Sequence, residues 1–176
     1  MKKLLLSLLI SFSTVVLAET PKGFFGIELM KNAKQYVTDA KLAGKVRNPE
    51  TINNYYDFYL NPPEINPYFE RYFLTVNNRN IIHQIAAKKN YTDLQVCLRD
   101  VNEIKRRIEK KYNIILKEIK RSHPGFISYI KEIYFSNNDY LSLRCNERTS
   151  YDVSSYLLYR NHKFADDVER YYSKGF

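Results

Sequence analysis

The sequence has no tryptophan, only two cysteines and only five glycines among its 176 residues. Carbohydrate-binding platforms usually depend on tryptophan rings, so a platform of that kind is not expected. No glycine-rich phosphate loop and no Gly-x-Ser-x-Gly or His-Glu-x-x-His run occurs. These absences exclude the hydrolases, nucleotide-binding proteins and zinc proteases that carry their chemistry in a short local motif.

Long apolar runs are also missing after residue 19. At the N-terminus, Met1-Lys2-Lys3 precedes an apolar segment of about 14 residues, whereas a bilayer-spanning helix needs roughly 17 to 25. Val16 and Ala18 have the β-branched or small side chains that signal peptidase accepts before its cut. We therefore expect residues 1–18 to be a bacterial signal peptide cleaved near Ala18, with an uncleaved anchor as the alternative. Residues 19–176 then form one periplasmic or secreted domain without a transmembrane segment.

Apolar residues at helical spacing predict two helices in the first two thirds of the chain. A short helix is expected over 29–43, where Gly44 ends it. A long helix is expected over about 92–120, with Thr92 as its N-cap and Gln95 completing a capping box. The apolar stripe of the long helix recurs at intervals of three and four residues: Leu94, Cys97, Val101, Ile104, Ile108, Tyr112 and Ile115.

Runs of aromatic and β-branched residues between turn residues predict strands. The expected strands cover 55–60, 69–76, 81–87, 126–135, 140–146 and 153–159, and a C-terminal helix covers 163–173. Turns are expected at Asn77-Asn78 and Asn137-Asn138-Asp139. Consecutive hairpins indicate an antiparallel sheet packed against the long helix, which is an α+β fold.

The two cysteines fall on inward-facing positions of this predicted fold. Cys97 belongs to the apolar stripe of the long helix, and Cys145 alternates with Leu141 and Leu143 on one strand face. An exported protein meets an oxidising compartment, so we predict a structural disulfide between Cys97 and Cys145. Two free thiols are the alternative. A redox thiol lacks support because no Cys-x-x-Cys spacing occurs.

The chain is basic, with a formal net charge of +9, or +7 once Lys2 and Lys3 are removed with the leader. Five basic residues of the predicted long helix lie at steps of seven and four, on a ridge away from the apolar stripe: Arg99, Arg106, Lys110, Lys117 and Arg121. Such a ridge suits an acidic protein face, anionic lipid or a polyanion. The alternative is an ordinary solvated helix face in a composition set by A/T-rich codons.

Residue types that carry chemistry are present without a catalytic pattern. The histidines are His83, His123 and His162, and no two of them have metal-ligand spacing. Carboxylates near the C-terminus are Asp152, Asp166, Asp167 and Glu169. Acids near a helix N-terminus usually interact favourably with the helix dipole. We therefore expect no catalytic residue, no metal and no cofactor.

The run Gly23–Lys31 (GFFGIELMK), followed by a short helix and hairpins, resembles the start of two kinds of small exported α+β domain. These are the β-lactamase-inhibitor-protein kind and the small-lipoprotein kind of outer-membrane assembly. The resemblance covers about a dozen residues and the order of elements. The sequence departs from the pattern at Met30, where a glycine is expected, and it has no lipidated cysteine. The resemblance implies a partner-binding scaffold.

These observations favour a non-enzymatic protein-interaction module over other classes. The expected partner is another envelope or extracellular protein, and nucleic acid is not expected. Two alternatives remain open from the sequence. One is a small envelope hydrolase whose site uses a carboxylate or a tyrosine, and the other is a binder of anionic surfaces through the basic helix face.

Overall fold

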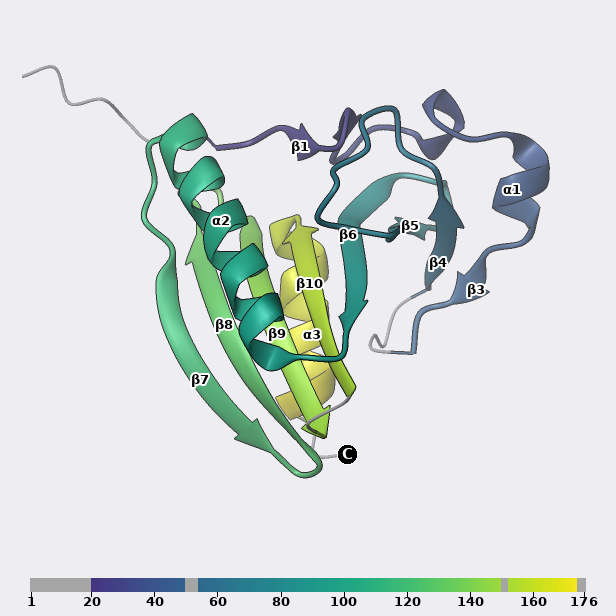
Figure 1. Cartoon of the computed structure of the whole chain (residues 1–176). Coiled ribbons are helices and arrows are strands. Elements are labelled where there is room, and N and C mark those ends of the chain that lie inside the picture. The colour runs from purple at the N-terminus through teal and green to yellow at the C-terminus, as the bar shows by residue number, and fades with distance from the viewer. Residues whose placement is uncertain (1–19, 50–53, 150–151, 174–176) are drawn as a thin grey trace, which may run out of the picture.

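The computed structural model describes residues 20–49, 54–149 and 152–173. The predicted signal peptide, residues 1–18, lies outside the described residues. The fold is α+β, as predicted, with a large antiparallel sheet and three α-helices among the described residues (Figure 1). In the described part of the chain, no helix is long and apolar enough to cross a membrane.

The N-terminal segment contains short elements instead of the helix predicted over 29–43. It comprises β1 (Gly23–Phe24), β2 (Ile27–Glu28), the 3-10 helix η1 (Ala33–Gln35) and α1 (Asp39–Ala43). The predicted helix is broken at three points: Met30 has a φ of 63°, and Asn32 and Thr38 have extended backbones, with ψ of 128° and 158°. Thr38 then caps α1, and Gly44 ends it as expected.

The main sheet has eight strands in the order β3-β4-β5-β6-β10-β9-β8-β7, and all neighbours are antiparallel. The strands are β3 (Val46–Arg47), β4 (Tyr55–Leu60), β5 (Arg71–Asn77), β6 (Ile82–Tyr91), β7 (Lys117–His123), β8 (Phe126–Tyr134), β9 (Tyr140–Thr149) and β10 (Asp152–Arg160). Two meanders, β3 to β6 and β7 to β10, are thus joined side by side through β6 and β10 (Figure 1).

The β5–β6 turn forms where it was predicted, but with a different residue in the left-handed region. Asn80 has the positive φ, 60°, that was expected at Asn77-Asn78. The side-chain Oδ1 of Asn77 accepts hydrogen bonds from the backbone N–H groups of Arg79 and Ile81. The turn therefore spans more residues than a two-residue hairpin loop.

Helix α2 (Leu94–Tyr112) is the predicted long helix, shortened at both ends. Its N-cap is Asp93 in place of Thr92, because the Asp93 carboxylate accepts hydrogen bonds from the N–H groups of Gln95 and Val96. At the C-terminus Asn113 adopts the left-handed conformation and ends the helix. The extension to residue 120 is therefore wrong, and residues 117–123 form strand β7 instead.

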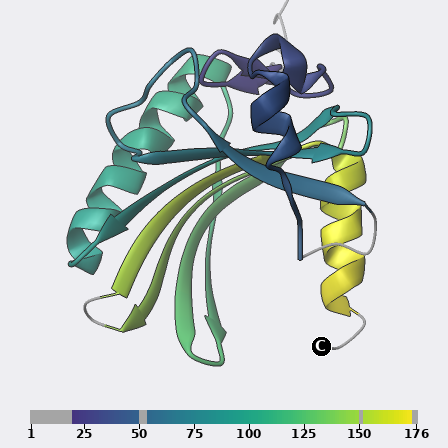
Figure 2. The same ribbon diagram turned by 90° about the vertical axis from the view of Figure 1, so that its right-hand side faces the viewer.

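The two faces of the sheet have different coverings. Helix α2 contacts β6, β9 and β10 on one side, which we call the α2 face. Helix α3 (His162–Ser173) lies on the opposite side, the α3 face, near β6. Figure 2 shows the two helices on opposite sides, with the long strands bending between them.

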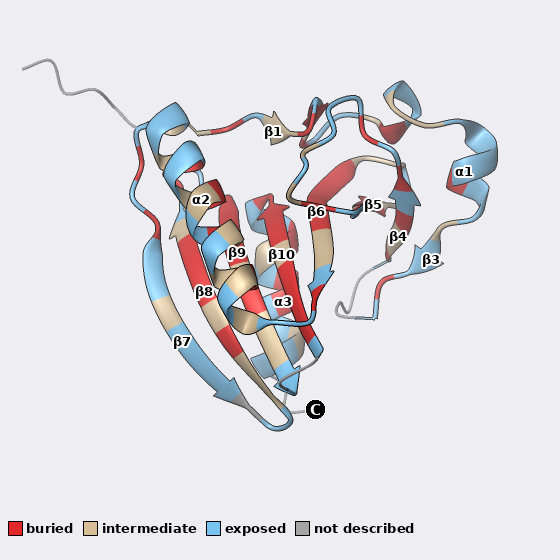
Figure 3. Ribbon diagram, viewed as in Figure 1, coloured by how far each residue is buried: buried red, intermediate tan, exposed pale blue. Residues whose placement is uncertain are grey.

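The main core lies between α2 and the sheet. Cys97, Val101, Ile104 and Ile108 of α2 are buried, and they pack with alternate residues of the central strands. Figure 3 shows this burial in α2 and in β6, β9 and β10, whereas β7 and α1 are mostly exposed. The sulfurs of Cys97 and Cys145 lie 2.11 Å apart in this layer, with their Cα atoms 6.1 Å apart. The structure thus joins the two cysteines that were predicted to pair.

A smaller core fixes α3 to the other face. Tyr55 of β4 packs edge-on against Phe164, and Val168 completes this cluster. Burial raises the pKa of Tyr55 to about 12, with a further contribution from the Asp167 carboxylate. The helix is therefore held by apolar contact with a neutral tyrosine.

His83 lies beneath the start of α3 and is only 3% exposed, so it is a buried residue of this face. Its Nδ1 is 3.0 Å from Oδ1 of Asn161, which also accepts the N–H of Phe164. Nδ1 therefore carries the proton and donates a hydrogen bond to Oδ1 of Asn161. Burial lowers the pKa of His83, and the hydrogen bond with Asn161 opposes this effect.

Reduction of the disulfide should destabilise the domain. The sequence separation of 48 closes a loop worth about 4 kcal/mol of unfolded-chain entropy. We expect dithiothreitol to lower the free energy of unfolding by roughly 2 to 4 kcal/mol in urea titrations. The Cys97→Ala/Cys145→Ala variant is the control, because its stability should not respond to reductant. Alkylation of both thiols in protein purified without reductant would contradict the pairing.

Acidification should weaken the α3 attachment through His83. Its pKa in the folded state lies below the usual value of 6.5, so the folded protein takes up this proton at lower pH than the unfolded chain does. The stabilisation is complete above pH 6.5 and is lost as the pH falls from there through the folded-state pKa. Each tenfold difference in proton affinity between the two states is worth about 1.4 kcal/mol. Urea titrations of wild type and His83→Gln between pH 7 and 5 measure this contribution, and parallel pH profiles would show that His83 makes none.

Candidate functional site

The structure divides the five predicted ridge residues between two elements. Arg99, Arg106 and Lys110 lie together on the outer side of α2. Lys117 and Arg121 lie on β7. They are an even number of residues apart, so both side chains lie on the α3 face. The predicted ridge of five is therefore wrong as one surface, because α2 ends before it reaches residues 117 and 121.

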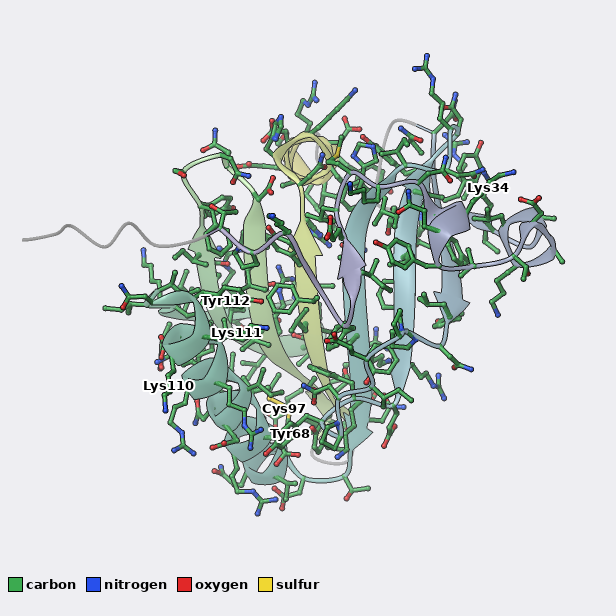
Figure 4. All side chains as sticks on the ribbon, turned by 90° about the horizontal axis from the view of Figure 1, so that it is seen from above. Lys34, Tyr68, Cys97, Lys110, Lys111 and Tyr112 are labelled. Carbon is green, nitrogen blue, oxygen red and sulfur yellow. A yellow bond between two sulfur atoms is a disulfide. The ribbon has the colours of Figure 1, made fainter. Side chains whose placement is uncertain are left out.

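The outer side of α2 is nevertheless basic. Its exposed residues are Gln95, Arg99, Asn102, Arg106, Arg107, Lys110 and Lys111. All of them are cationic or amide side chains, and no acidic residue of α2 is exposed. Figure 4 shows Lys110 on the side of α2 that points away from the sheet. We call this set the α2 outer surface.

The acidic residues of α2 are engaged at its flanks. Asp100 is 3.8 Å from Nζ of Lys89 and accepts a 3.2 Å hydrogen bond from the Tyr91 hydroxyl. Glu109 lies 3.2 Å from Nζ of Lys105, and it accepts the backbone N–H of Leu116 at 2.8 Å. Asp100 therefore links α2 to β6, and Glu109 links α2 to the segment that precedes β7.

Glu103 is the remaining acid, and it lies between two exposed arginines. Its carboxylate accepts a 2.9 Å hydrogen bond from Nε of Arg107 and pairs with Arg106. The hydrogen bond from Arg107 lowers the pKa of Glu103. Exposed pairs of this kind contribute little to stability. The side chains of Arg106 and Arg107 are 75% and 66% exposed, so both guanidinium groups remain accessible to a partner.

The α3 face contains polar residues that sequence reasoning missed. One network crosses four strands in a single row: the Thr75 hydroxyl donates to Asp57 at 2.6 Å, and the Gln84 amide donates to Thr75 at 2.9 Å. Gln84 in turn accepts a hydrogen bond from Nε of Arg160. Arg160 also lies over the ring of Phe164, 5.6 Å from its centroid. This row therefore links the centre of the sheet to α3.

A second network lies farther along the same face. The Tyr140 hydroxyl donates to Glu132 at 2.5 Å and accepts from Nη2 of Arg144 at 3.0 Å. Nε of Arg144 donates to the Ser142 hydroxyl at 3.1 Å. Arg121, one of the predicted ridge residues, lies 3.4 Å from Glu132. The sequence signal for this face was the polar residue at every second position of β9, opposite Leu141, Leu143 and Cys145.

A shallow hollow of about 340 Å³ lies at the other end of the sheet, beside α1. Its lining residues are Tyr36, Val37, Thr38, Lys41, Tyr59, Leu60 and Asn61. The lining contains a cation and two phenols but no carboxylate, so it offers no carboxylate pair for acid–base chemistry.

The other residues considered from the sequence are dispersed. His162 is exposed at the start of α3, His123 ends β7, and His83 is buried. Asp152, Asp166 and Glu169 are exposed, whereas Asp167 is buried and lies 3.2 Å from Arg170. Within residues 20–49, 54–149 and 152–173, no group of three or more His, Cys, Asp or Glu residues is placed to hold a metal ion.

Comparisons with known proteins give no relative from which a function could be transferred. No protein-family model matches the chain, and neither a curated protein nor a solved structure matches it. The resemblance of Gly23–Lys31 to small exported domains therefore rests on the sequence alone. The functional interpretation depends on the residues of this chain and on their arrangement.

Proposed function

We propose that this chain is an exported, non-enzymatic interaction module that binds an acidic face of another envelope or extracellular protein. The α2 outer surface is the contact. The observation that carries the proposal is the sorting of charge on α2: basic and amide residues occupy every exposed position, Asp100 and Glu109 are turned to the flanks, and Glu103 lies half-buried between Arg106 and Arg107. A face of one sign attracts and orients a partner of the opposite sign.

Charge and shape favour a protein partner over a lipid surface. Arg99 and Lys111 are about 18 Å apart along the helix axis, which suits a patch on a folded protein. Helices that bind lipid surfaces insert apolar side chains into the headgroup region. The α2 outer surface has no apolar residue among its exposed positions. Its attraction is therefore purely electrostatic and polar.

Catalysis has weaker support from the geometry. Asp57 and Glu132 accept hydrogen bonds from hydroxyl groups inside the α3 face, and Asp167 pairs with Arg170. These contacts give the carboxylates structural roles in holding strands and α3 together. The binding proposal needs none of them to react.

Photo-crosslinking in the cells that export the protein tests the proposal. A benzoylphenylalanine in place of Asn102 lies on the α2 outer surface, and the same group in place of Gln35 on η1 is the matched site elsewhere. We expect a discrete protein adduct from position 102 only. High salt should reduce its yield, because screening weakens contacts between exposed charges.

Charge-reversal variants provide a second test of the same surface. Arg106→Glu/Lys110→Glu should weaken the apparent affinity by about 10-fold or more. Arg47→Glu/Arg79→Glu changes the net charge equally on β3 and the β5–β6 turn and should leave the adduct intact. An equal loss of adduct in both variants would show that binding depends only on net charge and not on the α2 outer surface. Salt-sensitive sedimentation with phosphatidylglycerol vesicles, without any adduct at position 102, would replace the protein partner with a membrane.

A further inference from the structure

The α3 face contains a second concentration of positive charge, on the opposite side of the sheet from α2. Four residues are successive Cα partners across β5, β6, β10 and β9: Arg71, Lys88, Tyr156 and Arg144. We call them the basic row. Adjacent strands are about 4.8 Å apart, so the three cations lie within about 15 Å of one another. Nζ of Lys88 lies 5.2 Å from the centroid of the Tyr156 ring between them.

Arg144 is positioned by neutral groups. Its Nε donates to Ser142 and its Nη2 donates to Tyr140, and both acceptors are hydroxyl oxygens. A guanidinium has five N–H donors in a rigid fork, so these two contacts fix its plane and leave donors for a ligand. Ser142 is 0% exposed and Tyr140 is 5% exposed, so the support is built into the core of this face.

The nearest carboxylate does not neutralise Arg144 directly. Oε2 of Glu132 accepts the hydrogen bond from the Tyr140 hydroxyl, and its Oε1 lies 3.4 Å from Nη2 of Arg121. The charge of Glu132 is therefore shared with Arg121, and it reaches Arg144 only through a hydroxyl group. Arg144 and Lys88 are both partly buried. Partly desolvated cations without a carboxylate are unfavourable unless an anion joins them.

The rows on either side of the basic row complete a mixed surface. On one side lie Phe73, Ala86, Leu158 and Ser142. On the other side lie Asn90, Ser154, Asn146 and Ser128. The second of these rows consists of hydroxyl and amide side chains and has no acid. The first row continues on β8 with Glu132, which accepts a hydrogen bond from Tyr140 and lies 3.4 Å from Arg121. An anion is therefore expected on the side of the second row, where hydroxyl and amide donors lie beside the cations.

We propose that the basic row binds a tetrahedral oxyanion, phosphate or sulfate, carried by a small ligand. Arginine matches the oxygen spacing of such groups with its planar fork, and lysine adds a point charge. Three cations within four successive strands, on β5, β6 and β9, suit the several oxygens of one multivalent anion. This site is independent of the α2 outer surface, because the sheet lies between them.

Inorganic phosphate and sulfate are the probes, and acetate is the planar comparison. Amide resonances of the isotopically labelled protein are followed during titration at millimolar concentrations. We expect phosphate and sulfate to shift resonances of β6, β9 and β10 and to raise the unfolding temperature, with a smaller effect of acetate. Arg144→Gln and Lys88→Met should each weaken phosphate binding by about 10-fold.

Two further variants separate a binding role from a structural one. Arg144→Lys keeps the charge but loses the fork, so it should bind phosphate more weakly than wild type and more tightly than Arg144→Gln. Arg106→Gln removes a cation of the α2 outer surface and should bind phosphate as wild type does. Should Arg144→Gln fail to fold, Lys88→Met and Arg144→Lys still give a decision.

Two outcomes would overturn the oxyanion site. One is the absence of shifts in β6, β9 and β10 at millimolar phosphate and sulfate. The other is an equal response of wild type and Lys88→Met. Because Arg144→Gln leaves the α2 outer surface unchanged, it should still form the position 102 adduct. The experiments therefore distinguish a failure of the oxyanion proposal from a failure of the proposal for the α2 outer surface.

Discussion

The antiparallel pairing of β6 with β10 is the contact on which the rest of the structure depends. It joins two meanders that are each local in sequence, and it runs from Tyr91 opposite Val153 to Gln84 opposite Arg160. Helix α2 connects the meanders and must therefore cross the sheet, where Cys97 meets Cys145 on the adjacent strand. On the other face, the same pairing places Arg160 beside Gln84 and Tyr156 beside Lys88. Both candidate surfaces thus depend on one non-local ladder.

Secondary structure could be predicted from the sequence where the apolar periodicity and the local turn residues indicated the same element. Strands β8 and β10 and the start of β9 were predicted to within one residue, because Leu141, Leu143 and Cys145 alternate with polar residues and asparagines mark the turn before them. Cys97 could be placed opposite Cys145 because each lies on an apolar face. The N-terminal helix over 29–43 was only partly right, since the left-handed Met30 cannot be read from an apolar periodicity.

The end of the long helix was predicted wrongly because the same residues fit both the helical period of 3.6 and the strand period of 2. Ile114, Ile115 and Leu116 continue a helical stripe as readily as they begin a strand, and the structure buries Ile114 and Leu116 while Ile115 is 83% exposed. The decision is made by Asn113, which leaves the helix, and by Glu109, which binds the N–H of Leu116. The basic row was out of reach for another reason. Its members come from four strands, and their adjacency follows from strand order, which no local pattern contains.

Net charge alone would not distinguish a binding protein from one whose lysines reflect codon usage. The placement of the acids is more informative, because codon usage sets how many charged residues exist and not where they lie. Glu132 and Asp167 are buried, and Asp100, Glu103 and Glu109 are engaged around α2. The folding of the chain thus uses carboxylates in internal contacts and leaves cations on the α2 outer surface and along the basic row. Other acids are exposed, for example Asp39, Glu64 and Asp166, but none of them belongs to either of the two basic surfaces. The local placement of charge, and not a general burial of acids, therefore makes these two opposite faces positive.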